Sequence, residues 1–161
     1  MEKTKIKGLI AATVTPGVAG VFVCGTTGES LFLDTEERKK VAEAWMKFSD
    51  RLKILVHVGS TSYRISSELA VHAGLIGADA ISAMGPCFLQ PNRVEELVQF
   101  NKLIAEKAPG IPYYYYHIPT TSGVNIHMPA FLEKAASEIP TLNGIKYTSY
   151  NSMEMQECIN Y

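Results

Sequence analysis

A lysine in the middle of a short apolar segment is the residue of this sequence best suited to covalent chemistry. Lys146 lies within residues 142–149 (LNGIKYTS), a pattern typical of a β-strand. Because side chains alternate between the two faces of a strand, Gly144, Lys146 and Thr148 share one face. A neutral lysine in such a place is the nucleophile that Schiff-base chemistry on a carbonyl requires. Taken alone, the segment is better explained as an edge strand whose lysine reaches into water. Whether Lys146 is catalytic therefore depends on the other motifs.

Residues 25–30 (GTTGES) follow an apolar run and contain two glycines around paired threonines. In such a turn, backbone N–H groups and the hydroxyls of Thr26 and Thr27 can converge on a carboxylate or a phosphate. A plain turn between a strand and a helix explains the same pattern equally well. The motif therefore predicts an anion-binding loop only if other groups of a site lie beside it.

Four successive tyrosines occupy residues 113–116 and are followed by His117. Tyr116 falls at the predicted end of a strand, where its phenol could transfer a proton at the same site. Tyrosines in such a run are more often packing residues, so we expect at most one or two of the four to be catalytic.

Six apolar runs predict β-strands that alternate with helices, and they lie at residues 8–15, 20–25, 53–59, 80–84, 113–118 and 142–148. Two of the helices between them are expected to begin at capping patterns, Asp34 with Glu37 and Asn92 with Glu95. This alternation predicts an α/β fold with a parallel sheet covered by helices. Polar residues collect just after several strands, which favours a TIM (β/α)8 barrel, with about six of its eight strands present, over a doubly wound sheet.

The composition is that of an ordinary globular domain, with 47% hydrophobic and 19% charged residues among 161. A net charge of −1 without a basic tract argues against nucleic-acid and membrane partners and leaves small molecules. Three widely spaced cysteines without a CxxC pair predict neither disulfides nor a zinc site and fit a reducing cytoplasm. His57 and His72 have no partner at metal-ligand spacing, and His57 is expected to be buried and hydrogen-bonded.

Three motifs together resemble the N-acetylneuraminate lyase and dihydrodipicolinate synthase superfamily of pyruvate-dependent class I aldolases. They are GTTGES at 25–30, YHIP with SGV at 116–124, and GIKYTS at 144–149, in the order and approximate spacing of that superfamily. The resemblance covers nearly the whole chain and implies a (β/α)8 barrel. It implies that Lys146 forms the Schiff base, that Tyr116 transfers the proton, and that Thr26 and Thr27 hold the pyruvate carboxylate. It further implies a homo-oligomer, a tetramer, that needs no metal or cofactor because the imine is itself the electrophile.

Two departures from the synthase pattern indicate the lyase branch of that superfamily. Thr121 stands where the synthase branch carries an arginine for the carboxylate of its aldehyde, and Cys87 and Phe88 replace paired tyrosines. Thr148 matches the lyase residue at the sugar end of the site. The resemblance thus implies reversible cleavage of N-acetylneuraminate to pyruvate and N-acetylmannosamine. The alternatives are another pyruvate aldolase, such as the synthase, and an inactive barrel fragment that only binds a ligand or a partner.

The spacing of the first two predicted strands suggests that the sequence is incomplete. Only residues 16–19 separate them, whereas parallel strands need a connection of about a dozen residues and four residues extend at most ~14 Å. We therefore expect a single catalytic domain over residues 1–161, with a segment missing between Pro16 and Gly17 and a C-terminal part missing after Tyr161. A Cα–Cα distance far beyond about 3.8 Å between Pro16 and Gly17 would identify the gap.

Overall fold

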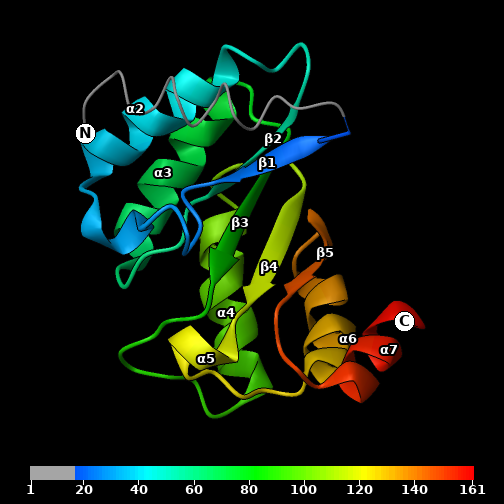
Figure 1. Cartoon of the computed structure of the whole chain (residues 1–161). Helices are drawn as coiled ribbons and strands as arrows, with labels where there is room; N and C mark the ends of the chain where they lie inside the picture. The colour runs from blue at the N-terminus through cyan, green and yellow to red at the C-terminus, as the bar shows by residue number, and fades with distance from the viewer. Residues whose placement is uncertain (1–16) are drawn as a thin grey trace.

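The computed structural model describes residues 17–161 and contains five parallel strands that alternate with helices (Figure 1). The strands are β1 (Gly20–Val23), β2 (Lys53–His57), β3 (Ala80–Met84), β4 (Tyr113–His117) and β5 (Leu142–Tyr147). Between and after them lie the 3-10 helix η1 (Ser30–Phe32) and the helices α2 (Thr35–Met46), α3 (Tyr63–Leu75), α4 (Val94–Ala105), α5 (Pro119–Ser122), α6 (Met128–Glu138) and α7 (Ser152–Ile159). The five strands predicted from residue 20 onward are confirmed. The strand predicted at 8–15 and the Pro16–Gly17 junction involve residues outside the described range.

Each strand pairs in parallel with the next, so that the order in the sheet is β1-β2-β3-β4-β5. A doubly wound sheet reverses its strand order at one point, whereas a barrel adds each strand beside the last. The sequential order therefore confirms the barrel architecture. Helices α2, α3, α4 and α6 follow one another along the outer face of the sheet, from α2 beside β1 and β2 to α6 beside β5 (Figure 1).

The outer face of the sheet and the helices that cover it form the main hydrophobic core. Ile54, Ile81, Tyr113 and Tyr115 point outward from their strands and are fully buried, together with helix residues such as Leu97. Burying side chains of this size stabilises the fold by roughly 1.5–3 kcal/mol each. Two of the four tyrosines are thus packing residues, as the sequence predicts.

The inner face of the sheet carries a smaller and separate apolar cluster. Phe22, Met84, Tyr116 and Ile118 pack together on this face. Because side chains alternate along a strand, the same face receives Lys146, whose register partner on β4 is Tyr116. The fold thus brings residues of β1, β4 and β5 together on the side that would line a barrel.

The helix caps agree with the sequence at one predicted position and not at the other. At the start of α2, the Asp34 carboxylate accepts the Glu37 amide at 2.7 Å and the Glu37 carboxylate accepts the Asp34 amide at 3.1 Å, which is a complete capping box. The cap predicted from Asn92 and Glu95 is wrong. Helix α4 begins one residue later, after Arg93, and the Glu96 carboxylate accepts the Asn92 amide at 3.1 Å. Two adjacent glutamates made the register of this cap ambiguous in the sequence.

Candidate active site

Lys146 lies on the inner face of β5 between two aromatic rings. Its Nζ atom is 3.8 Å from the centre of the Tyr116 ring and 5.1 Å from the centre of the Phe22 ring. A cation over an aromatic face is attracted by the ring quadrupole, so the two rings hold the lysine head in place. The side chain is half-buried, and among residues 17–161 its ammonium forms no ion pair with a carboxylate. Lys146 thus lies on the same face of the sheet as Phe22 and Tyr116.

The loop after β1 reaches the same place from the opposite edge of the sheet. The hydroxyl oxygens of Thr26 and Tyr116 are 3.4 Å apart, although 90 residues separate them in the chain. Three of the predicted site residues, Thr26, Tyr116 and Lys146, therefore lie together. Thr27 follows directly in the loop and is exposed, as Thr26 is.

The backbone of this loop is a compact turn with two residues in the left-handed region. Cys24 has a φ angle of 57° and Glu29 of 52°, a conformation that is costly for residues other than glycine. The Gly28 amide donates to the Gly25 carbonyl at 3.0 Å, and the Glu29 amide to the Thr26 carbonyl at 2.9 Å. These two amides are used within the turn, so they are not directed at an anion. The exposed polar groups that remain on this part of the loop are those of Thr26 and Thr27.

A buried polar network of His57 and Arg38 supports the start of the loop after β1. The Nδ1 atom of His57 lies 2.9 Å from the Cys24 carbonyl oxygen, and Arg38 of α2 donates to the carbonyls of His57 at 2.6 Å and Gly59 at 2.9 Å. Burial, reinforced by the Arg38 and Lys146 charges, lowers the pKa of His57 to about 3. Burial also lowers the pKa of Arg38 and raises the pKa of the Cys24 thiol. His57 is therefore neutral, and it is buried and hydrogen-bonded as predicted.

Thr148 links the ends of β4 and β5. Its backbone amide and its hydroxyl both donate to the His117 carbonyl, at 3.0 and 2.7 Å. The hydroxyl is therefore engaged with the main chain in this structure, and Thr148 is exposed at the strand end on the same side as Lys146. Burial lowers the pKa of the neighbouring His117. The contact holds the end of the lysine strand to the strand that carries Tyr116.

The outer side of the same strand is held by Glu154 of α7. The Tyr147 hydroxyl donates to the Glu154 carboxylate at 2.6 Å, and the Met128 amide, at the start of α6, donates to it at 2.9 Å. Burial raises the pKa of Glu154, but these two hydrogen bonds and the nearby histidines outweigh it, so the net change is downward. Burial and the bond to Glu154 raise the pKa of Tyr147. Glu154 thus ties β5 to two helices on the side away from the site.

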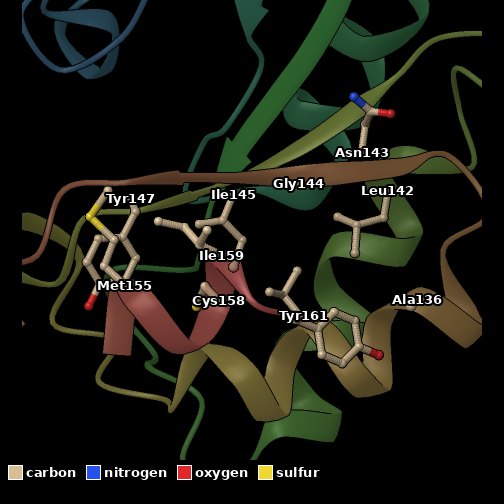
Figure 2. A pocket seen from close by; sticks show the side chains of 11 residues that line it. Ala136, Leu142, Asn143, Gly144, Ile145, Tyr147, Met155, Cys158, Ile159 and Tyr161 are labelled. Carbon is tan, nitrogen blue, oxygen red and sulfur yellow. The ribbon is translucent and has the colours of Figure 1, made fainter. Parts of the chain in front are cut away.

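Two hollows of about 380 Å³ each lie beside β5. One is bordered by Lys146 and by residues of β1, β2 and β4 on the inner face. The other lies between β5, α6 and α7, where Figure 2 shows Ile145 and Ile159 directed into it and Asn143 directed away. The lining of this second hollow is mostly apolar and contains none of the predicted site residues. The candidate site is therefore the inner side, at Lys146.

Three residues that surround the site were not predicted from the sequence to belong to it. Arg38 reads as one of many charges on a helix, although its spacing to Ala42 and Trp45 places it on the buried face. Phe22 reads as an ordinary strand residue, and His57 as a core histidine.

Among residues 17–161, no group of three histidines, cysteines or acids could hold a metal ion. The three cysteines are free, and no helix in this range is long and apolar enough to cross a membrane.

An amine, a phenol and a hydroxyl-bearing loop side by side are suited to condensation of the amine with the carbonyl of an oxo acid. The Lys146 amine supplies a nucleophile, the Tyr116 phenol can transfer protons, and the Thr26 and Thr27 groups can bind a carboxylate next to the carbonyl.

Known proteins match this chain over nearly its whole length. It matches the dihydrodipicolinate synthetase family over residues 1–161. It is 39% identical to the N-acetylneuraminate lyase of Homo sapiens over 183 aligned residues, covering 98% of this chain and 57% of that protein. The solved N-acetylneuraminate lyase (sialic acid aldolase) of Aliivibrio salmonicida is 40% identical with a TM-score of 0.95, over 99% of this chain and 53% of that one. A catalytic lysine mutant of the sialic acid aldolase of Ruminococcus gnavus is 28% identical with a TM-score of 0.91, over 99% and 52%. The chain thus spans a little over half the length of these relatives.

Proposed function

Because this chain belongs to the dihydrodipicolinate synthetase family, we propose that the protein is an N-acetylneuraminate lyase, which cleaves N-acetylneuraminate reversibly to pyruvate and N-acetylmannosamine. One observation carries the proposal: the Lys146 amine lies 3.8 Å from the Tyr116 ring, and the phenol of that ring lies 3.4 Å from the Thr26 hydroxyl. The similarity to proteins named N-acetylneuraminate lyase, at 39 and 40% identity, supports this branch of the family.

In the proposed mechanism, the Lys146 amine attacks the C2 ketone of the open-chain sugar, and loss of water gives a protonated imine. Tyr116, directly or through the substrate carboxylate, takes the proton of the C4 hydroxyl. The C3–C4 bond breaks, its electron pair moves into the imine to form an enamine, and N-acetylmannosamine leaves as the aldehyde. Protonation of the enamine at C3 and hydrolysis release pyruvate and restore the amine.

Thr26 and Thr27 orient the substrate carboxylate throughout this sequence. The place of Thr26 supports this role, because its hydroxyl lies 3.4 Å from the phenol of Tyr116, and the ring of Tyr116 is 3.8 Å from the Lys146 amine. We propose that Thr148 contacts the sugar end, as its exposure at the end of β5 allows. No metal or cofactor is required, since the imine accepts the electrons.

The experiment that tests the substrate compares two reactions of the whole protein. Release of pyruvate from N-acetylneuraminate, coupled to lactate dehydrogenase, is expected to be efficient. Condensation of pyruvate with aspartate semialdehyde is expected to be slower by at least about one to two orders of magnitude. Thr121, exposed on α5, offers no charge to the aldehyde carboxylate, and a hydrogen bond to a charged group contributes roughly 1.5–3 kcal/mol. Efficient condensation without cleavage would overturn the lyase proposal in favour of the synthase.

We also propose a cytoplasmic homotetramer. The three free cysteines fit a reducing compartment. Phe88 and Leu89, in the loop after β3, are 85% and 79% exposed, and adjacent exposed apolar side chains of this size mark contact surfaces. Analytical ultracentrifugation of the whole protein is expected to give a tetramer mass, and a monomer at micromolar concentration would contradict the assembly.

A further inference from the structure

His57 is a buried polar residue that the proposed mechanism does not use. Its side chain is 2% exposed on the inner face of β2. Its ring centre is 5.7 Å from that of Tyr116, edge to face, and 5.8 Å from that of Phe22. The two rings that hold the Lys146 amine therefore also pack against this imidazole.

The hydrogen bond of the His57 ring identifies which of its two nitrogens carries the proton. Nδ1 lies 2.9 Å from the Cys24 carbonyl oxygen. A carbonyl can only accept, so Nδ1 carries the proton and Nε2 carries a lone pair. Within residues 17–161, this Nε2 atom is fully buried and has no hydrogen-bond partner. An apolar side chain of similar size would avoid the cost of burying that atom, so the contribution specific to histidine is the bond from Nδ1 to Cys24.

Cys24 is the residue at which the chain turns from β1 into the threonine loop. Its φ angle of 57° is unfavourable for a residue with a side chain, so its conformation needs outside support. Its carbonyl lies two residues before Thr26, whose hydroxyl is 3.4 Å from the Tyr116 phenol. A shift of the Cys24 peptide would move both threonines relative to Tyr116.

The other end of this support is itself fixed. Arg38 donates to the carbonyl of His57 at 2.6 Å and to that of Gly59 at 2.9 Å, so the end of β2 is held to α2. The path from helix α2 through His57 to Cys24 is continuous and buried, which gives the imidazole a rigid base. Charge-assisted hydrogen bonds of this kind are among the stronger ones in proteins.

We propose that His57 is a positioning residue for the threonine loop: its Nδ1–H holds the Cys24 carbonyl and thereby sets the affinity of Thr26 and Thr27 for the carboxylate of the substrate. The proposal rests on the proposed function for the identity of that carboxylate, which is tested with pyruvate. His57 acts on binding and does not touch the reacting atoms.

Two amide variants of His57 distinguish the effect of the hydrogen bond to Cys24 from the effect of having a polar side chain at this position. His57→Asn places an N–H where Nδ1 stands and can still donate to Cys24, whereas His57→Gln places its N–H nearer to the position of Nε2 and cannot. His72→Asn, on α3, replaces a partly exposed histidine away from the site and is the matched control for loss of a histidine. Each whole protein is treated with pyruvate and sodium borohydride, and adduct formation is followed against pyruvate concentration.

The Gln variant should need about tenfold more pyruvate for half-maximal trapping, while the final amount of adduct stays the same. That factor is the effect expected from losing one hydrogen bond to a buried carbonyl. The Asn variant and the His72 control should stay within about threefold of the parent protein. Equal pyruvate dependence of the Asn and Gln variants, whether both normal or both weakened, would overturn the proposal.

Hydrogen–deuterium exchange of the peptide spanning residues 20–33 gives a readout that does not depend on catalysis. The Gln variant should exchange faster there and the Asn variant should not. Absence of any pyruvate adduct in the parent protein would reject the proposed function, and the exchange data would still decide the role of His57. Unchanged exchange in a folded Gln variant would contradict the positioning role of His57.

Discussion

The two strand ends that meet at the candidate site are held by different means. At the β1–β2 end, the loop carrying Thr26 rests on Arg38 and His57, which are 4% and 2% exposed. At the β4–β5 end, Lys146 is half-buried, and its strand is held from outside by Glu154, which is itself only half-buried. Hydrogen bonds to buried charges resist water and salt, whereas exposed ones are weakened by both. The part proposed to bind the carboxylate should therefore be more rigidly built than the part that carries Lys146, the proposed nucleophile.

Removing the phenol of Tyr116 should have the largest effect, because Tyr116 is where the two ends meet. Tyr116→Phe should lower the turnover of N-acetylneuraminate by ~10²–10⁴-fold, the range typical of lost proton transfer, while pyruvate trapping stays largely intact. The ring itself, which packs against Lys146, is kept in this variant. Steady-state kinetics measure the effect, with Tyr63→Phe on the surface of α3 as the control. Unchanged turnover would remove Tyr116 from the mechanism.

Arg38→Met should be the most destabilising single change at the β1–β2 end. It leaves two carbonyls, those of His57 and Gly59, without their charged donor, which should cost about 3 kcal/mol of unfolding free energy. Urea denaturation of the whole protein measures the loss. Arg64→Met, on the exposed side of α3, should change stability by at most about 0.5 kcal/mol. A loss at Arg38 no larger than that at Arg64 would refute the idea of a rigid end.

The free energy of unfolding of the parent protein should fall with decreasing pH more steeply than that of a variant without His57. Burial, Arg38 and Lys146 depress the folded-state pKa of His57 to about 3, against about 6.5 in the unfolded chain. Between these values only the unfolded chain takes up the proton, so the contribution of neutral His57 is complete above pH 6.5 and is lost as pH falls. The loss is about 1.4 kcal/mol per pH unit, or roughly 2 kcal/mol between pH 7 and 5.

His57→Gln does not titrate, so its stability should fall less than that of the parent protein over the same interval. His117, whose pKa burial also lowers, is present in both proteins, and its contribution cancels in the difference. Urea denaturation at pH 7 and pH 5 gives the comparison. Parallel losses in the two proteins would show that His57 is not buried in its neutral form.

Glu154→Gln tests the β4–β5 end and should have the smallest effect, about 1 kcal/mol. Glu154 uses one carboxylate oxygen for each donor, whereas glutamine has a single acceptor oxygen. That oxygen can still accept from the Met128 amide, while the Tyr147 hydroxyl can rotate to accept from the NH2 group, so the main loss is the charge. Thermal unfolding compares it with Glu157→Gln, an exposed neighbour on α7. If the loss matched that of Arg38→Met, the contrast between the two ends would fail.

The sequence predicted those parts of the molecule that depend on local pattern. Alternating apolar runs identified all five described strands, and the Asp34 and Glu37 pair marked the start of α2. The three motifs brought Thr26, Tyr116 and Lys146 into one site, because parallel strands end at the same edge of a sheet. Single-residue features were less accessible, such as the amides that the turn after β1 uses internally.

Contacts between distant segments could not be read from the sequence. The bond from Arg38 of α2 to carbonyls of β2 depends on how deeply the helix packs, and the aromatic surroundings of Lys146 depend on the curvature of the sheet. Both are set by tertiary packing, which local spacing does not contain. His57 was predicted correctly as buried and hydrogen-bonded, but its partner, Cys24, lies 33 residues away.

Borohydride trapping shows whether Lys146 forms the proposed Schiff base with pyruvate. The whole protein treated with pyruvate and sodium borohydride should gain one reduced adduct, and peptide mass spectrometry should find it on Lys146. Lys146→Ala should gain none, whereas Lys53→Ala, an exposed lysine paired with Asp79, should gain it as the parent does. An adduct on another residue, or none in a folded protein, would contradict the role proposed for Lys146.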